Sequence, residues 1–226
     1  MVWHSEGATI APSDATVGKI TLDAKVLAGL VVLSRELLED DDQLRQAFAA
    51  VMATKVDQAA LYGTGTAPEP RGVKNTYGIT TASLGANGAA LASYDPLVDV
   101  AGTLRDNNED PTAVIYSPRS ARALAKPKDT TNQPLAVPGY YLDRLSRFET
   151  NQVPNTLTQG TSNLASDIFT ADFRQLFIGV RTQLQIQILT EKYADTGQIG
   201  LVAWWRGDVA VARPKAFHVT SGFSDG

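Results

Sequence analysis

Five acidic side chains lie close together in Glu36–Asp42, and they are the densest group of chemically reactive residues in the chain. Carboxylates are the ligands that hard cations such as Mg²⁺ and Ca²⁺ prefer, so a metal site is one interpretation. The same acids stand directly before a long stretch whose apolar residues have helical spacing. Because the N-terminus of a helix favours negative charge, we interpret them as a solvated helix start and predict no metal site.

The sequence does not favour a reaction that uses histidine, because His4 and His218 are the only two histidines and lie near opposite ends of the chain. A catalytic triad or a two-histidine metal centre would need one of them beside a suitable partner. The chain contains neither a G-x-S-x-G nor an H-E-x-x-H spacing. We therefore interpret both as structural residues and predict no catalysis and no cofactor. A stand-alone enzyme is the remote alternative, which a cavity with convergent polar groups would favour.

The segment Gly63-Thr64-Gly65-Thr66 has the glycines of a phosphate loop but not its context. A phosphate loop connects a strand to a helix and ends in Gly-Lys-Ser or Gly-Lys-Thr. Here the glycines follow a helical pattern, which predicts a helix stop and a turn. The chain has no cysteine, so disulfides and thiolate metal sites are excluded.

A tryptophan pair and a set of arginines are more typical of packing and binding contacts than of catalysis. Trp204 and Trp205 are adjacent, so in a strand one should enter the core while the other faces a neighbouring element or subunit. A role in stacking a ligand is the less favoured alternative. Six arginines in loops and strands could meet nucleic-acid phosphates without reading sequence, although we expect most to form surface or intersubunit pairs. They are Arg144, Arg147, Arg174, Arg181, Arg206 and Arg213.

One long amphipathic helix is the main predicted element. Apolar and small residues recur with i, i+3, i+4 spacing, which predicts one buried face. They are Leu44, Ala47, Phe48, Val51, Met52, Val56, Ala59 and Ala60. Asp40 and Gln43 can form a reciprocal N-cap, and Gly63 ends the helix. Roughly 22 residues give a rod of about 33 Å, long enough to act as a structural spine.

The remaining pattern alternates between helices and strands. Residues 2–10 and 17–26 flank a turn-forming loop and predict a hairpin that packs on something outside the chain. A helix from Pro96, a strand over Thr112–Tyr116 and a helix through Ala125 that Ser117 caps predict a compact α/β unit. The first of these helices should bury one row of side chains, Leu97, Val100, Ala101 and Leu104. Apolar alternation predicts strands in the tail. These strands are Leu176–Ile178, Leu184–Ile188 and Gln198–Val219.

Composition limits the class of protein further. The chain is 43% hydrophobic and 19% charged, which is typical of a globular protein with a substantial core. A net charge of −4 does not indicate sequence-specific binding of nucleic acid. The N-terminus has no signal-peptide pattern, and the longest apolar run, Val26–Leu33, is too short to cross a bilayer. We expect a soluble protein with no membrane partner.

Several motifs resemble one family. The opening of the long helix, Ser34–Asp40, reads S-R-E-L-L-E-D, and its end carries Asp57, Ala60, Leu61, Gly63 and Gly65. Near the C-terminus Arg206 and Asp208 precede Arg213–Phe217, which reads R-P-K-A-F. Glu6, Gly7, Ser13 and Gly18–Thr21 match the segment before the helix. Together these motifs resemble the major capsid proteins of tailed bacteriophages, with residues 85–165 matching by pattern alone.

The resemblance implies an α+β phage capsid fold, known as the Hong Kong phage fold. Residues 1–26 would form an extended arm, residues 27–92 and 196–226 a peripheral domain with the spine helix and antiparallel strands, and residues 93–195 an inserted α/β axial domain. The implied intersubunit residues of the arm are Trp3, His4, Glu6, Ile10 and Lys19. The candidate site residues of the closing strand are Trp204, Trp205, Arg206 and Arg213.

The implied function is a major capsid protein that self-assembles into pentamers and hexamers of an icosahedral shell enclosing double-stranded DNA. The protein would be located in the virion, after assembly in the host cytoplasm. Portal, scaffold or decoration proteins are further expected partners. An encapsulin, a bacterial nanocompartment shell with the same fold, is the main alternative. Because relatives usually carry additional N-terminal residues, we also expect the chain to be a shortened or processed form.

One departure from the family concerns covalent links between subunits. Some relatives join a lysine of the arm to an asparagine near the closing strands, with a glutamate as the base. In this chain Lys19 and Lys25 could supply the amine, but Trp204 stands at the glutamate position and Gly197 near the asparagine position. We therefore expect a shell without these links.

Overall fold

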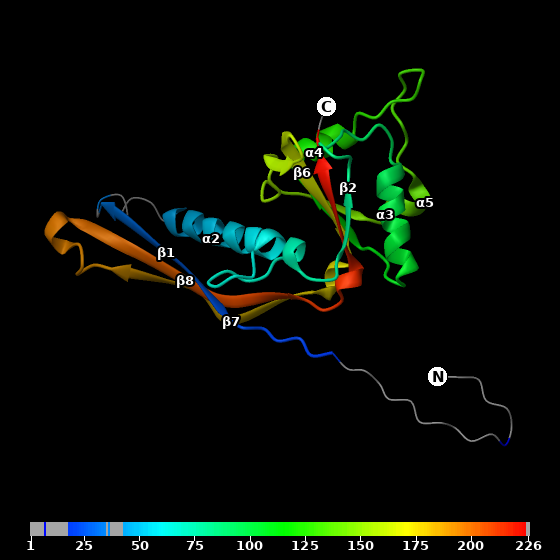
Figure 1. Cartoon of the computed structure of the whole chain (residues 1–226). Helices are drawn as coiled ribbons and strands as arrows, with labels where there is room; N and C mark the ends of the chain where they lie inside the picture. Colours follow the sequence, from blue (N-terminus) through cyan, green and yellow to red (C-terminus); the bar gives the residue numbers. More distant parts are fainter. Residues whose placement is uncertain (1–6, 8–17, 35, 37–42, 225–226) are drawn as a thin grey trace.

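The computed structural model describes residues 7, 18–34, 36 and 43–224 of the chain and contains two β-sheets. Figure 1 shows one long, narrow sheet beside a more compact part with further strands and helices. The narrow sheet is antiparallel with the order β1-β8-β7. Its strands are β1 (Lys25–Ser34), β7 (Leu176–Leu189) and β8 (Gln198–Val211).

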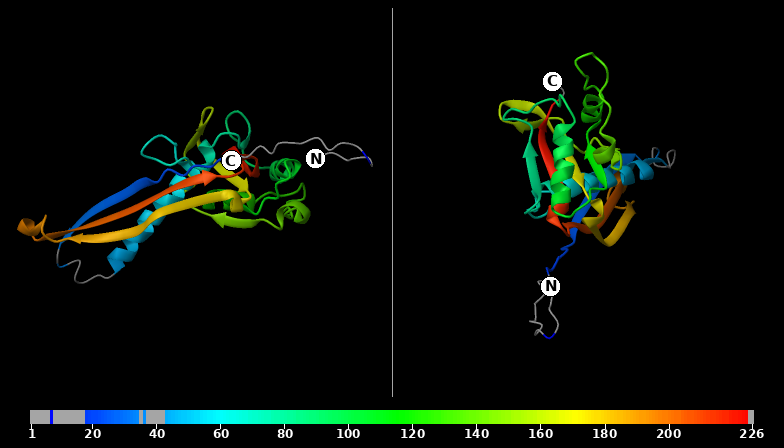
Figure 2. Two further views of the ribbon diagram at one scale, coloured as in Figure 1. Left: turned by 90° about the horizontal axis from the view of Figure 1, so that it is seen from below. Right: turned by 90° about the vertical axis from the view of Figure 1, so that its right-hand side faces the viewer.

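The predicted long helix is confirmed as α2 (Gln43–Tyr62), with 20 residues. It ends where predicted, because the amide N–H of Gly63 donates to the carbonyl oxygen of Ala59 at 2.9 Å and the helix goes no further. The predicted cap at Asp40 lies outside the described residues. The helix runs along one side of the narrow sheet, as the views in Figures 1 and 2 agree.

The buried face of α2 is narrower than predicted. Met52 and Ala60 are buried, and Phe48 and Val56 are half-buried against the sheet. Val51 was predicted to lie on this face and does not, since 57% of its surface is exposed. At 100° per residue, Val51 is turned away from the Phe48–Met52–Val56 row, which already fills the contact. Ala47 is exposed for the same reason.

The second sheet has six strands, in the order β2-β9-β6-β3-β4 with β5 paired to β6. Its strands are β2 (Thr80–Ser83), β3 (Ala113–Tyr116), β4 (Ser146–Glu149), β5 (Leu157–Gln159), β6 (Ser162–Ala171) and β9 (Phe217–Phe223). Antiparallel β6 pairs with β9 on one side and β3 on the other. Sequence reasoning placed β3 correctly and did not find the central strand β6.

Strand β6 lies between two hydrophobic clusters. Ile168 packs into one with Leu97 and Val114, while Phe169 packs into the other with Phe217. Both faces of the strand are therefore covered, so its residues show no alternation of apolar and polar types. This is why a search for alternating patterns missed it.

Two helices of the second part, α3 (Asp95–Asp106) and α4 (Pro118–Leu124), confirm the predicted helices. The short helix α5 (Gly139–Leu142) was not predicted. Helix α3 buries the predicted row of Leu97, Val100, Ala101 and Leu104. Helix α4 is capped by Ser117, whose hydroxyl accepts from the amide of Ser120 at 3.1 Å. Short 3₁₀ turns complete the chain at Val73–Asn75, Phe173–Gln175, Ala194–Thr196 and Pro214–Ala216.

Three predictions about strands need correction. The tail segment Gln198–Val219, predicted as one strand, is divided into β8 and the start of β9, which lie in different sheets. The predicted strand over residues 17–26 is wrong for residues 18–24, which are in no strand, because within the described residues they have no ladder partner; β1 starts at Lys25. Residues 176–178 and 184–188, predicted as separate strands, belong to one 14-residue strand, β7, with bulges near Thr182.

The division into arm, peripheral and axial domains stays a prediction. Strand pairing adds two facts to it. Strand β7 lies in the sheet of β1 and β8, although the predicted axial range extends to residue 195. Strand β9 lies beside β6 in the other sheet, although residues 196–226 were predicted as peripheral.

Candidate intersubunit surface

One face of the narrow sheet packs against α2. Gly29 of β1 allows the helix to approach, because a Cβ atom there would lie 3.2 Å from the ring of Phe48. Trp205 of β8 faces the same side and lines a hollow together with Met52 and Val56. Helix α2 therefore covers part of this face, while Ile178 and Val180 of β7, which line the same hollow, are 48% and 51% exposed.

The opposite face of the narrow sheet is open, and on it apolar side chains of β1 and β8 lie beside the exposed Gln185 and Gln187 of β7. Side chains alternate along a strand, so the residues next to Gly29 and Trp205 point away from α2. Val26, Leu30 and Trp204 are 54%, 49% and 42% exposed. Phe177 of β7 is 50% exposed on this side as well. We call this surface, which also includes Val32, the open face. Monomeric soluble proteins rarely expose contiguous apolar patches of more than a few hundred Å².

The two tryptophans lie on opposite faces of β8, as predicted, but neither enters the core, because Trp205 is half-buried and Trp204 is exposed. Trp205 packs between the sheet and α2, whereas Trp204 lies on the open face, where its indole N–H donates to Gln185 Oε1 at 3.2 Å. Arg206 follows on the same strand as Trp204 and is half-buried. Arg213 lies beyond the strand, and its guanidinium pairs with the largely buried Glu109 at 3.1 Å.

Residues 18–24 form an extended segment without secondary structure that leads away from the narrow sheet (Figure 1). The base of this segment is held by the amide of Asp23, which donates to Asp208 Oδ2 at 2.6 Å. Leu22 lies over Gly179, where a Cβ atom would be only 2.7 Å from its Cδ1 atom. Lys19 is exposed, and Ile20 is 49% exposed. The other predicted arm residues, Trp3, His4, Glu6 and Ile10, lie outside the described residues.

The candidates for catalysis or metal binding do not come together in the part of the chain that is described. Within it, no group of three or more histidines or acids is placed to hold a metal ion. In the acidic cluster only Glu36 is described, and it is exposed. His218 is 3% exposed in β9, and burial lowers the pKa of its ring to about 4. It is therefore a neutral, buried histidine in a strand, as predicted.

The Gly-Thr-Gly-Thr segment forms a turn, as predicted. The amide of Gly65 donates to the carbonyl oxygen of Pro70 at 3.0 Å, and Thr64 and Arg71 form an isolated antiparallel bridge. Gly72 donates in turn to the carbonyl of Gly63 at 2.9 Å. The amides that a phosphate would need are thus used within the loop.

Sequence reasoning missed a buried polar cluster that joins α2 to β6. Asp167 is 1% exposed and accepts hydrogen bonds from the Tyr62 hydroxyl at 3.0 Å and from Lys74 Nζ at 2.6 Å. The ring of Tyr62 also contacts Phe169 edge to face, with centroids 5.4 Å apart. An acid directly before the apolar pair Ile168-Phe169 was a signal for such a partnered buried charge, but the partners lie about a hundred residues away in sequence.

Comparison with known families identifies the class of protein. The chain belongs to the phage capsid family, whose model matches residues 1–222. It is a major capsid protein, a structural protein of the shell, and the predicted resemblance is confirmed. Of the described helices, none combines the length and the apolar composition that a membrane crossing requires.

Solved structures support the same fold. The capsid of a native GTA particle is 20% identical with a TM-score of 0.75, covering 99% of this chain and 81% of that chain. The corresponding protein of Mycobacterium phage Ogopogo is 18% identical with a TM-score of 0.71, covering 96% and 81%. A more distant neighbour is the holo-SrpI encapsulin complex from Synechococcus elongatus PCC 7942, with 14% identity, a TM-score of 0.61 and coverage of 90% and 75%. A search of curated proteins found no match.

Proposed function

We propose that this capsid protein assembles into pentamers and hexamers that close into an icosahedral shell around double-stranded DNA. The observation that carries the proposal is the open face, an extended surface of the narrow sheet that carries exposed apolar side chains and that α2 does not cover. In this proposal the face is covered by a neighbouring subunit, with residues 1–26 as the contacting arm. The virion is then the site of the mature protein, and the host cytoplasm the site of assembly.

The geometry of the narrow sheet supports association between copies of the chain. A symmetric oligomer uses the same surfaces on every subunit, and a head-to-tail contact closes into a ring when the rotation allows it. The open face and the extended segment 18–24 lie at different places on one subunit, as a head-to-tail contact requires (Figure 1). Leu22 and Ile20 give the extended segment the apolar side chains that such a contact would bury.

A charge placed on the open face tests this proposal. Leu30→Glu should keep the fold, because Leu30 is half exposed, and should abolish particles in electron micrographs of the complete gene product. Leu30→Met at the same position keeps the apolar surface and should assemble normally. Normal particles from Leu30→Glu would show that the open face is not an interface.

The DNA within the shell would be bound without sequence readout. Arg144, Arg147 and Arg181 are exposed, whereas Arg174 and Arg213 pair with Asp172 and Glu109. With a net charge of −4, binding by the isolated subunit should be weak and should fall steeply with salt. A tight preference for one sequence at physiological salt would contradict this part of the proposal. Portal, scaffold and decoration proteins remain further proposed partners.

An encapsulin-like shell is the second candidate, favoured by the structural similarity to the SrpI complex. The two functions differ in particle size and in content. Purified phage-type particles should contain nucleic acid, which an absorbance ratio and nuclease-protected DNA would reveal. Particles that contain a cargo enzyme and no DNA would favour the encapsulin-like function.

A further inference from the structure

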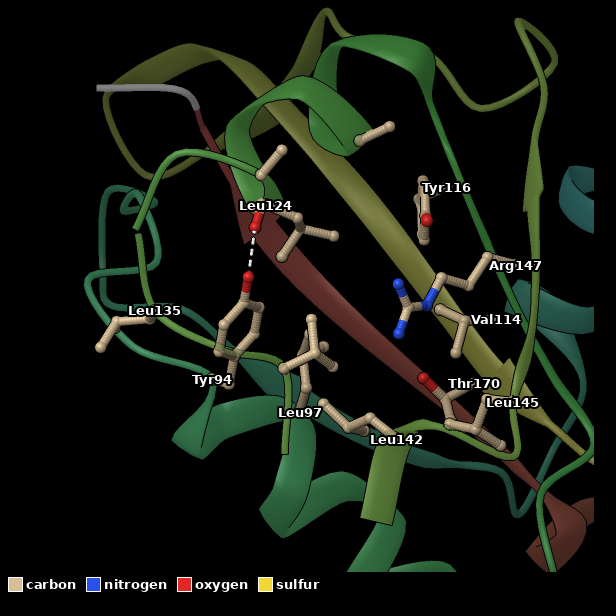
Figure 3. A pocket seen from close by; sticks show the side chains of 13 residues that line it. Tyr94, Leu97, Val114, Tyr116, Leu124, Leu135, Leu142, Leu145, Arg147 and Thr170 are labelled. Atoms are coloured by element: carbon tan, nitrogen blue, oxygen red, sulfur yellow. Dashed lines mark hydrogen bonds between the residues drawn. The ribbon is translucent and has the colours of Figure 1, made fainter. Parts of the chain in front are cut away.

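A cavity of about 300 Å³ lies in the compact part of the molecule, between the six-stranded sheet and helices α3, α4 and α5. It is distant in the fold from the open face. Most of its walls are aliphatic (Figure 3). Six of these lining residues are Leu97, Val114, Leu124, Val137, Leu142 and Leu145. This volume is at the lower end of the range for small-molecule sites.

Besides Tyr94 and Tyr116, two polar side chains line this cavity, and they come from β6 and β4, the strands on either side of β3. Thr170 of β6 pairs with Val114 of β3, and Val114 pairs with Arg147 of β4. Residues opposite each other across strands point to the same face of a sheet, so all three side chains face the cavity. In Figure 3 the hydroxyl of Thr170 and the guanidinium of Arg147 point toward the same region of the pocket.

The two groups differ in their surroundings. Thr170 is 2% exposed, and its hydroxyl oxygen is buried without a hydrogen-bond partner. Arg147 is exposed to solvent and interacts electrostatically with Tyr116, but it forms no hydrogen bond or ion pair within the described residues. The Tyr94 hydroxyl, in contrast, is already engaged, because it donates to the carbonyl oxygen of Leu124 at 2.7 Å. A buried hydroxyl without a partner costs free energy, and a ligand would remove that cost.

We propose that this cavity binds a small aliphatic monocarboxylate, with its chain among the leucines and its carboxylate between Arg147 and Thr170. A guanidinium presents two parallel N–H donors that match the two oxygens of a carboxylate. The Thr170 hydroxyl adds a donor from the other side. The walls are mostly aliphatic, with Tyr94 and Tyr116 as the aromatic residues, and this composition favours an alkyl chain. The limited volume selects a short or medium chain.

Calorimetric titration of the purified full chain with octanoate, below its micelle concentration, tests the proposal. We expect saturable one-to-one binding with a Kd below about 1 mM. Arg147→Gln should weaken this binding by about tenfold or more, since it removes a charge-assisted pair. Arg147→Lys keeps the charge but not the two parallel N–H donors, and it should give an intermediate loss of affinity. Thr170→Val, which matches threonine in shape, should weaken binding severalfold.

Two controls separate recognition of the carboxylate from general apolar adsorption. Arg144→Gln removes an exposed arginine that does not line the cavity, and it should leave the Kd unchanged. 1-Octanol should bind the wild-type chain more weakly than octanoate does. Its Kd should be the same for Arg147→Gln and for wild type. Absence of saturable binding, or an equal Kd for octanoate in Arg147→Gln, would overturn the proposal.

Discussion

Asp167 is the residue that joins the long helix to the six-stranded sheet. It is fully buried and accepts from both Tyr62 and Lys74, so removing it leaves two donors without an acceptor. Asp167→Ala should lower the free energy of unfolding by about 2 kcal/mol or more, measured by urea denaturation. Asp110 is a matched control, because its carboxylate pairs with Arg105 while 70% exposed. Asp110→Ala should change stability by less than about 1 kcal/mol, and equal losses in the two variants would contradict the assignment.

His218 gives the protein a dependence of stability on acid. Burial lowers the pKa of its ring to about 4 from the usual value of 6.5, so as pH falls the unfolded chain takes up a proton before the folded chain does. The free energy of unfolding should therefore fall as pH drops from about 6.5 to about 4 and be unaffected by this residue above that window. His218→Gln should reduce the loss between pH 7.5 and pH 5 by about 2 kcal/mol.

Denaturant titrations of wild type and His218→Gln at the two pH values provide the measurement. Asp172 loses a stabilising interaction over a lower range, because hydrogen bonds from Arg174 outweigh burial and lower the pKa of its carboxyl. That loss occurs in both proteins and cancels in the comparison. Identical pH dependence in both would show that His218 is protonated or exposed in the folded chain.

At the level of helices and strands, the sequence predicted those features that depend only on residues close together in the chain. The end of α2 at Gly63, the cap at Ser117 and the buried row of α3 follow from neighbouring residues alone. Strand β6 and the Asp167 cluster depend on partners far away in sequence, which no local pattern contains. The exposure of Val51 shows the same limit, since helical spacing predicts a face but not its width.

The length of α2 makes it sensitive to a break in its middle. Ala53 is exposed in the third turn, so a change there tests the backbone and not the packing. Ala53→Pro removes a helical hydrogen bond and clashes with the preceding turn, which should cost about 3 kcal/mol or more. We expect insoluble protein or loss of assembly. Ala53→Gln should cost less than about 1 kcal/mol in the same melting experiment, and a normal melting temperature for Ala53→Pro would contradict the helix.

At the scale of the assembled shell, we expect subunits to be held together without covalent links. Gly197 offers no side chain, and Trp204, seven residues further on, cannot act as a base. The Lys25 amine pairs with Asp23 at 2.6 Å, and this hydrogen bond raises the pKa of the amine and disfavours the neutral nucleophile. Mature particles boiled in detergent should release one band at the mass of the monomer. A ladder of covalent multimers would contradict this, and mass spectrometry of linked peptides would identify the residues.

The central claim is that the open face of the narrow sheet is an interface in a closed shell. Electron microscopy with image reconstruction of particles assembled from the complete gene product tests it most directly. The account predicts icosahedral shells of pentamers and hexamers in which a neighbouring subunit covers Leu30 and Trp204, both exposed in the single chain. Protein that stays strictly monomeric at high concentration, or shells in which this face is bare, would contradict it.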